Sequence, residues 1–108
     1  MARIQILSVE PTRDTAERIH SVLEGADSNC SVIHVDSGGS AIDVLETDAV
    51  DCIVTEWTLP DTDGPPFLDA IRSRAPGIPV VCFTDQPVVD DVFGHGVTDY
   101  VYKQGGEN

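Results

Sequence analysis

The chain alternates short apolar stretches, each about the length of a β-strand, with segments of helical periodicity. The apolar stretches cover residues 3–9, 30–35, 51–56, 78–83 and 98–103. Three of them are nearly continuous in apolar residues, which is typical of strands that are buried on both faces. Strands of this kind form parallel sheets that carry helices on each side. The sequence therefore predicts an α/β fold with a doubly wound, five-stranded parallel sheet.

Three of the intervening segments have clear helix signals. In the first, apolar residues recur at helical spacing between Ala16 and Ala26, and Thr12 precedes them as a candidate cap. Ser37 is a candidate cap for a second helix. A third helix is expected to begin at the Gly-Pro-Pro sequence of residues 64–66, because proline suits the first helical turn.

The last quarter of the chain has weaker signals. Pro87 interrupts the segment between the fourth and fifth strands, so we expect a short fourth helix there. No helical pattern follows residue 103, so a fifth helix is expected to be missing. Another segment, domain or protomer would then have to cover the last strand.

Length and apolar content set the broad class of the protein. With 108 residues, the chain is long enough for one domain with a single core. It shows no apolar targeting stretch and no run near the ~20 apolar residues that a membrane helix needs. We therefore expect a cytoplasmic protein without a membrane partner.

The chain is strongly acidic, with 19 acidic residues against 6 basic ones and a formal net charge of −13. Such a charge repels phosphate backbones, so direct nucleic-acid binding is not expected. We interpret the acidity as a halophilic adaptation, because self-repulsion is screened over ~3 Å at 1 M salt. An acidic docking face is the alternative. Lys103 is the only lysine, which makes it a candidate functional residue.

The three cysteines and three histidines show no metal-ligand spacing. Cys52 and Cys82 fall inside predicted strands, and we interpret them as small buried apolar side chains. His20 lies on a predicted helix and is interpreted as solvated.

Residues 51–64 read Asp-Cys-Ile-Val-Thr-Glu-Trp-Thr-Leu-Pro-Asp-Thr-Asp-Gly. Apolar residues lead to the acid Glu56, and a Pro-x-x-Asp-Gly turn follows it. This order places a carboxylate at the C-terminal end of a buried strand, beside a loop that can close over it. The segment resembles the phospho-acceptor segment of receiver domains in two-component response regulators. In that family the acceptor is almost always aspartate, whereas this chain has Glu56.

Three other segments match the same family in the same order. Residues 4–9 resemble its first strand and end at Glu10, where receivers usually carry two adjacent acids. Residues 79–84 resemble its fourth strand, and residues 96–103 resemble its Gly-x-x-Asp-Tyr-x-x-Lys signature. The resemblance implies a flavodoxin-like sheet of strand order 2-1-3-4-5, with its site at the carboxyl ends of the strands.

The resemblance implies a magnesium site. Transfer of a phosphoryl group to a carboxylate needs a divalent cation to offset the charge on the phosphoryl oxygens. The ligands would be Glu10, Glu56 and the backbone carbonyl of Thr58. Pro11 stands where the family has its second acid, so we expect Mg²⁺ binding to be weakened.

The resemblance also gives three residues a role in switching. Lys103 would pair with the acceptor carboxylate or its phosphate, Thr84 would hydrogen-bond a phosphoryl oxygen, and Tyr100 would report phosphorylation by rotating. Plainer structural roles stay open beside these. They are a strand-end ion pair between Glu56 and Lys103, a turn cap at Thr84 and a core position for Tyr100.

Glutamate at the acceptor position favours impaired phosphorylation. It is longer than aspartate by one methylene, about 1.5 Å, and a misplacement of ~1 Å can cost on the order of 10²-fold in a positioned reaction. The carboxylate of Glu56 would also lie nearer to where a phosphoryl group sits, and it could imitate the phosphorylated state. Asp61 and Asp63 are alternative acceptors, and Asp63 is also placed to fix the loop.

These observations predict a receiver-like domain that is not an enzyme and acts by protein–protein interaction. Its partner would be a histidine kinase or a downstream signalling domain, and a homodimer stays open. We expect residues 1–108 to be the N-terminal module of a longer signalling protein, cut before its last helix. A working phosphorylatable receiver is the alternative. A flavodoxin-like domain that binds a small molecule is less favoured, because no Gly-rich loop follows the first strand.

Overall fold

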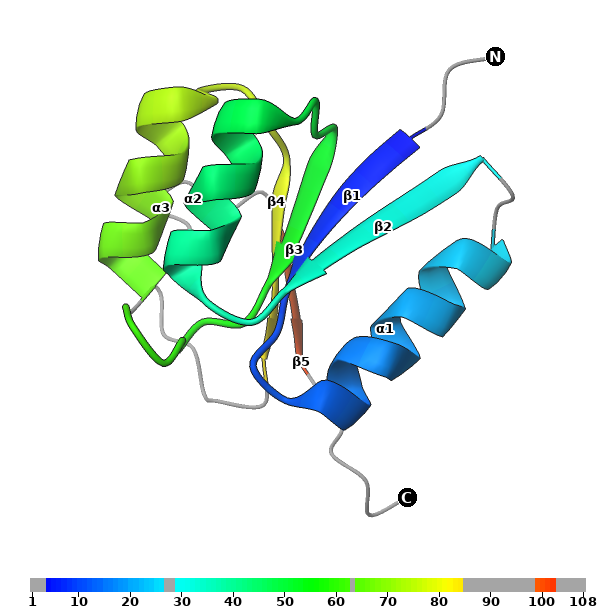
Figure 1. Cartoon of the computed structure of the whole chain (residues 1–108). Helices are drawn as coiled ribbons and strands as arrows, with labels where there is room; N and C mark the ends of the chain where they lie inside the picture. Colours follow the sequence, from blue (N-terminus) through cyan, green and yellow to red (C-terminus); the bar gives the residue numbers. More distant parts are fainter. Residues whose placement is uncertain (1–3, 27–28, 63, 85–98, 103–108) are drawn as a thin grey trace.

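The computed structural model describes residues 4–26, 29–62, 64–84 and 99–102. These residues form an open parallel sheet with helices on both faces (Figure 1). Its strands are β1 (Ile4–Val9), β2 (Cys30–Val35), β3 (Cys52–Thr55), β4 (Val80–Thr84) and β5 (Asp99–Tyr102). The helices are α1 (Arg13–Ala26), α2 (Gly38–Thr47) and α3 (Gly64–Arg74). The predicted α/β fold with a parallel sheet is confirmed.

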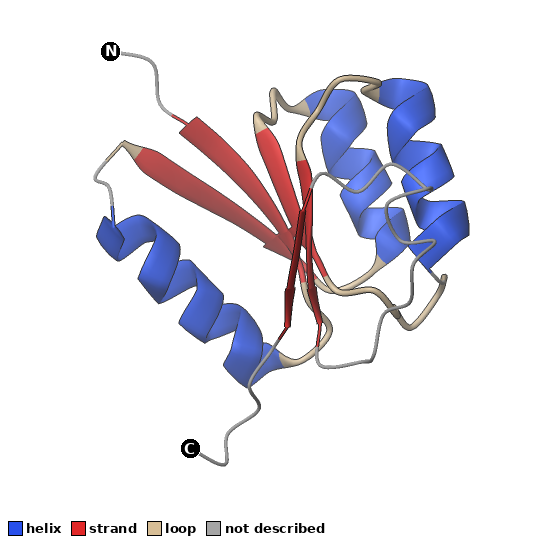
Figure 2. Ribbon diagram, turned by 180° about the vertical axis from the view of Figure 1, so that it is seen from behind, coloured by secondary structure: helices blue, strands red, loops and turns tan. Residues whose placement is uncertain are grey.

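The strands lie in the order β2-β1-β3-β4-β5, and every neighbouring pair is parallel. Helix α1 packs on one face against β2 and β1, and α2 and α3 lie together on the opposite face (Figure 2). From β1 the chain therefore crosses to β2 on one side of β1, and the next strand, β3, lies on the other side of β1. The direction in which strands are added reverses at this point. In sheets of this kind, the carboxyl ends of the strands at that reversal form the binding edge.

The hydrophobic core lies between the sheet and the pair of α2 and α3. Leu7, Ile53 and Val80 come from three adjacent strands and are completely buried. Ala41 of α2 and Ile71 of α3 close over them. Each completely buried aliphatic side chain of this kind contributes about 1.5–3 kcal/mol through burial. This face therefore fixes the positions of the three central strands.

The expected cap of the second helix is confirmed. The backbone N–H of Ser40 donates to Oγ of Ser37 at 3.2 Å.

The three cysteines are free thiols, and Cys82 is fully buried. Burial of Cys52 and the neighbouring charge of Asp51 raise the pKa of the Cys52 thiol.

Two predictions fall wholly or largely on residues 85–98 and 103–108, outside the described part of the chain. These are the short fourth helix and the missing fifth helix. The described part contains no helix that is long and apolar enough to cross a membrane.

Candidate functional site

Two buried acidic residues follow neighbouring strands at the reversal of the sheet. Val9 at the end of β1 is in register with Thr55 at the end of β3, so Glu10 and Glu56 follow at adjacent positions. The backbone N–H of Glu56 donates to the carbonyl of Val9 at 3.0 Å, which extends the ladder by one step. Glu10 is 2% exposed and Glu56 is 8% exposed. We call this pair the acidic edge.

The carboxylate of Glu56 is turned back onto the backbone at the end of β3. Its Oε1 accepts a hydrogen bond from the N–H of Trp57 at 2.8 Å. The hydroxyl of Thr55 donates to the carbonyl of Glu56 at 3.0 Å. Because hydrogen bonds to a charged acceptor are shorter and stronger than neutral ones, the first contact holds the side chain in one orientation. The predicted placement of Glu56 at the strand end is therefore observed.

Glu10 has a similar local anchor. Its Oε2 accepts the N–H of Thr12 at 3.1 Å, across the intervening Pro11. Proline has no N–H and is exposed here, so Pro11 brings neither a donor nor an acid to the acidic edge. In both residues, one carboxylate oxygen thus accepts a hydrogen bond from a backbone N–H, and the side chain is buried.

The loop after Glu56 is folded against the neighbouring helix. The N–H of Leu59 donates to the carbonyl of Thr62 at 3.0 Å, and the Leu59 side chain is 5% exposed in the core. Thr58 is exposed in this loop, between Trp57 and Leu59. Asp63, which was expected to fix the loop, lies outside the described residues.

Asp61 fixes this loop in a way that sequence reasoning missed. Its Oδ1 accepts the N–H of Gly38 and its Oδ2 accepts the N–H of Gly39, both at 2.9 Å. These two backbone N–H groups, that of Gly39 first, hold the pKa of the Asp61 carboxyl below its ordinary value. The one available signal was the Gly-Gly pair after Ser37, because residues without a side chain let an acceptor come close to the open N–H groups of a helix start.

The remaining predicted site residues belong to β4, β5 and the segment after it. Thr84 ends β4 and pairs in register with Tyr102, and Tyr100 pairs with Cys82. This places both residues toward the carboxyl half of the sheet, as expected from the family motifs. Lys103 lies outside the described residues, so its contact with Glu56 stays a prediction.

The donor set for a metal is small in the described part of the chain. Within residues 4–26, 29–62, 64–84 and 99–102, no group of three or more His, Cys, Asp or Glu side chains is arranged to hold a metal ion. The acidic edge offers two carboxylates, each already bonded to a backbone N–H. Mg²⁺ prefers six oxygen ligands and keeps several waters, so a site here would depend on solvent for most of its shell.

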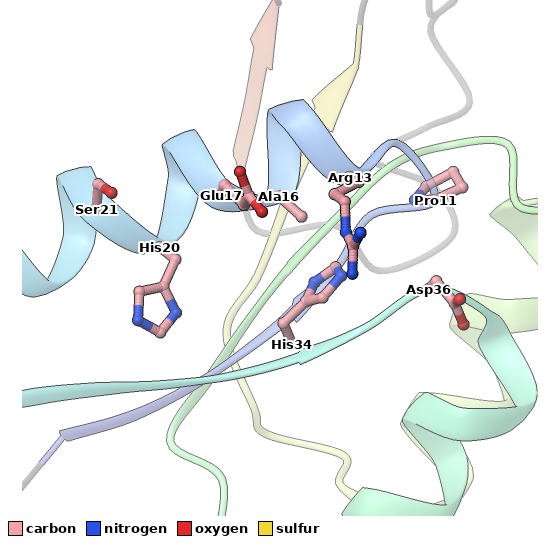
Figure 3. A pocket seen from close by; sticks show the side chains of 8 residues that line it. All are labelled: Pro11, Arg13, Ala16, Glu17, His20, Ser21, His34 and Asp36. Atoms are coloured by element: carbon pink, nitrogen blue, oxygen red, sulfur yellow. The ribbon is translucent and has the colours of Figure 1, made fainter.

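A separate groove lies between α1 and the outer strand β2 (Figure 3). It has a volume of about 680 Å³, and neither Glu10 nor Glu56 lines it. Arg13, His20 and His34 approach it from the two elements, together with Glu17 and Asp36. His20 Nε2 lies 3.2 Å from Oε1 of Glu24, and both side chains are partly exposed. The groove is therefore a mixed-charge surface feature, distinct from the acidic edge.

Comparison with known proteins places this chain in a family. Residues 6–108 match the response regulator receiver domain model. The chain belongs to that family, the receiver domains of two-component systems. Among curated relatives, it is 32% identical over 74 residues to the response regulator protein FleR of Pseudomonas aeruginosa, covering 66% of this chain and 16% of FleR. It is 29% identical over 98 residues to the regulatory protein LuxO of Vibrio cholerae, covering 88% of this chain and 21% of LuxO.

The chain thus spans about a fifth or less of the length of these curated relatives. Solved structures show the same fold over nearly the whole chain. The chemotaxis protein CheY4 of Vibrio cholerae superposes with a TM-score of 0.86 at 19% identity, covering 97% of this chain and 90% of CheY4. The response regulator TrrA of Thermotoga maritima, solved in complex with Mg²⁺-BeF, has a TM-score of 0.84 at 16% identity, covering 94% of this chain and 88% of TrrA.

Proposed function

We propose that this receiver domain acts by protein–protein interaction and that the carboxylate of Glu56 replaces or impairs phosphorylation. The observation that carries this proposal is the buried, backbone-anchored carboxylate of Glu56 at the acceptor position of the family motif. Glutamate has one methylene more than aspartate, about 1.5 Å of reach, and here its carboxylate is held at the strand end by the N–H of Trp57. A permanent charge there would act on the surrounding groups without a phosphoryl donor.

The acidic edge also supports the expectation that this domain binds a metal ion only weakly. A divalent cation is needed to offset the charge that develops on a transferring phosphoryl group. Pro11 removes one carboxylate from the place where the family has an adjacent pair, and Glu10 and Glu56 keep one oxygen each on the backbone. We therefore expect Mg²⁺ to bind weakly and phosphoryl transfer to be slow. The domain would have no turnover of its own.

The partners would be a histidine kinase or a downstream signalling domain. The relative LuxO is a regulatory protein, and another relative, NtrC of Klebsiella pneumoniae, is a DNA-binding transcriptional regulator. For the present domain, the net charge of −13 opposes direct contact with nucleic acid. Contact with another protein is the remaining route by which it would pass on a signal.

The alternative is a working receiver that uses Glu56 or a neighbouring Asp as acceptor. Asp61 is a poor candidate, because both of its carboxylate oxygens already accept backbone hydrogen bonds from α2. An attack on phosphorus would have to break at least one of these contacts. Glu56 is therefore the acceptor to test.

Intact-mass measurement after incubation with a small acyl-phosphate donor and Mg²⁺ separates the two candidates. We expect no phosphate on the natural chain and one phosphate on Glu56→Asp, because the shorter side chain restores the family geometry. The double variant Glu56→Asp with Pro11→Asp should be phosphorylated faster, by about tenfold or more, if the missing acid limits Mg²⁺ binding. Glu56→Asp combined with Asp69→Asn, which removes an exposed carboxylate of α3, is the matched control and should carry the same single phosphate as Glu56→Asp. A stable phosphate mapped to Glu56 of the natural chain would establish the working receiver instead.

A further inference from the structure

The first turn of α2 is completed by a residue from a distant loop. An α-helix begins with N–H groups that have no partner within the helix. Here the N–H groups of Gly38 and Gly39 donate to the two oxygens of Asp61, each at 2.9 Å. The N–H of Ser40 donates to Oγ of Ser37, and that of Ala41 donates to the carbonyl of Ser37. Of the three open N–H groups at Gly38, Gly39 and Ser40, two are therefore satisfied from the loop between β3 and α3 and one locally, and the N–H of Ala41 makes the first bond within the helix.

Steric contact joins the same two segments at the same place. A Cβ atom on Gly38 would lie 2.6 Å from Cγ2 of Thr62, a distance that real contacts do not reach. The same atom would lie 3.3 Å from Cδ1 of Phe67 in α3. Glycine at position 38 thus allows the loop to lie directly on the helix. The hydrogen bonds of Asp61 and the contact of Thr62 reinforce each other.

The loop that is held in this way begins at the acidic edge. Glu56 and Asp61 are separated by four residues, and Leu59 in between is anchored in the core. The N–H of Trp57, which Oε1 of Glu56 accepts, is the first donor of this loop. A loop fixed at Trp57, Leu59 and Asp61 has little freedom to move at one end without moving at the other.

We propose that Asp61 is a positioning residue that couples the acidic edge to the first turn of α2. Its carboxylate keeps the loop from Glu56 to Thr62 and the start of α2 in one arrangement. A change of charge or contact at Glu56 would then displace this turn of α2 first. This inference does not rest on the proposed function, because it holds whether or not Glu56 is phosphorylated.

Amide hydrogen exchange of the whole chain, followed residue by residue by NMR, tests the coupling. Asp61→Asn removes the charge but keeps the size of the side chain. We expect the amides of Gly38 and Gly39 to exchange at least about tenfold faster, because local opening of that turn becomes easier. The decisive readout is the loop itself: the amides of Trp57 and Leu59 should exchange faster by a similar factor.

Ser37→Ala is the matched control. It removes a cap from the same helix end, where the hydroxyl of Ser37 bonds to the N–H and Oγ of Ser40. It should speed exchange at Ser40 and leave Trp57 and Leu59 as they are in the natural chain. If Asp61→Asn speeds exchange only at Gly38 and Gly39, or if Ser37→Ala loosens the loop equally, Asp61 is a helix cap and the coupling is wrong.

A second variant keeps the test informative if Asp61→Asn does not fold. Asp61→Glu retains the charge but displaces it by about 1.5 Å, so it should fold and loosen both segments together to a smaller degree. The fluorescence of Trp57, the only tryptophan in the chain, gives an independent readout of the loop. Loosening of α2 without any change at Trp57 would again overturn the proposal.

Discussion

Two buried hydroxyl groups on neighbouring strands differ in their hydrogen bonding. Oγ of Ser8 in β1 is buried and has no hydrogen-bond partner within the described part of the chain. Oγ1 of Thr55 in β3 is also buried, and it donates to the carbonyl of Glu56 at 3.0 Å. A buried polar group without a partner costs about 1–3 kcal/mol, whereas a satisfied hydrogen bond contributes about 1 kcal/mol. The two side chains should therefore respond oppositely to removal of the hydroxyl.

Ser8→Ala should raise the free energy of unfolding by about 1 kcal/mol, because the cost of burying the hydroxyl disappears while its volume changes little. Thr55→Val keeps the shape of the side chain, removes its donor and should lower the free energy of unfolding by about 1 kcal/mol. Urea denaturation of both variants beside the natural chain measures the difference. A loss of stability in Ser8→Ala would mean that this hydroxyl is satisfied in solution.

The positions of the acidic residues could be predicted better than their contacts. Glu10 and Glu56 each directly follow apolar residues, so the sequence places each at a strand end, whereas the meeting of the two ends at one edge came from the strand order of the family. Their hydrogen bonds to Thr12 and Trp57 depend on side-chain rotation, which sequence patterns do not set. Asp61 was missed as a structural residue because its partners lie 22 and 23 positions away in the chain.

At the scale of elements, two glycines in helices have different reasons to be glycine. Gly38 in the first turn of α2 faces Thr62 so closely that a Cβ atom would lie 2.6 Å from it. Gly25 in the last turn of α1 has nothing within 4 Å of the same imagined atom. Glycine in a helix costs up to about 1 kcal/mol relative to alanine through lost backbone entropy. That cost is offset by a close approach only at Gly38.

Gly38→Ala should therefore destabilise the fold by about 1–3 kcal/mol, the usual range for overpacking. It should also displace the loop, because Thr62 is tied to Leu59 by a backbone hydrogen bond and cannot move away alone. Thermal denaturation followed by circular dichroism gives the stability change. Gly25→Ala is the control and should be neutral or stabilising by up to about 1 kcal/mol. Equal losses in both variants would refute the packing explanation.

The elements themselves could be predicted where the pattern was strong. The apolar stretch over 30–35 matches β2 residue for residue, and Ser37 caps α2 as expected. The stretch over 51–56 was predicted one residue too long at each end, since β3 covers Cys52–Thr55. Hydrophobicity does not mark the ends of a strand, because the hydrogen bonds between strands stop where the chain turns and not where the apolar residues stop. Strand order came from family resemblance, since periodicity alone carries no information on pairing.

At the scale of the whole molecule, the excess of acidic charge opposes compaction. A formal net charge of −13 is confined within a radius of gyration of 13.1 Å. The Debye length is ~10 Å at 0.1 M ionic strength, comparable to that radius, and ~3 Å at 1 M. Repulsion between acidic groups within about 10 Å of one another therefore operates at 0.1 M and is largely screened at 1 M. The sequence alone supports this expectation, because net charge does not depend on the fold.

The melting temperature should accordingly rise with salt, most steeply below about 0.5 M, where screening changes most. A gain of about 1 kcal/mol would correspond to about 4–8 °C for a domain of this size. Chloride and bromide salts of sodium should act alike, because screening depends on ionic strength and not on the identity of the anion.

The variants Asp43→Asn and Asp69→Asn each remove an exposed carboxylate, so they should melt higher than the natural chain at low salt and converge with it at 1 M. If the melting temperature is independent of salt, or if these variants differ equally at all salt concentrations, self-repulsion does not limit stability. The acidic surface would then be better explained as a docking face for a basic partner.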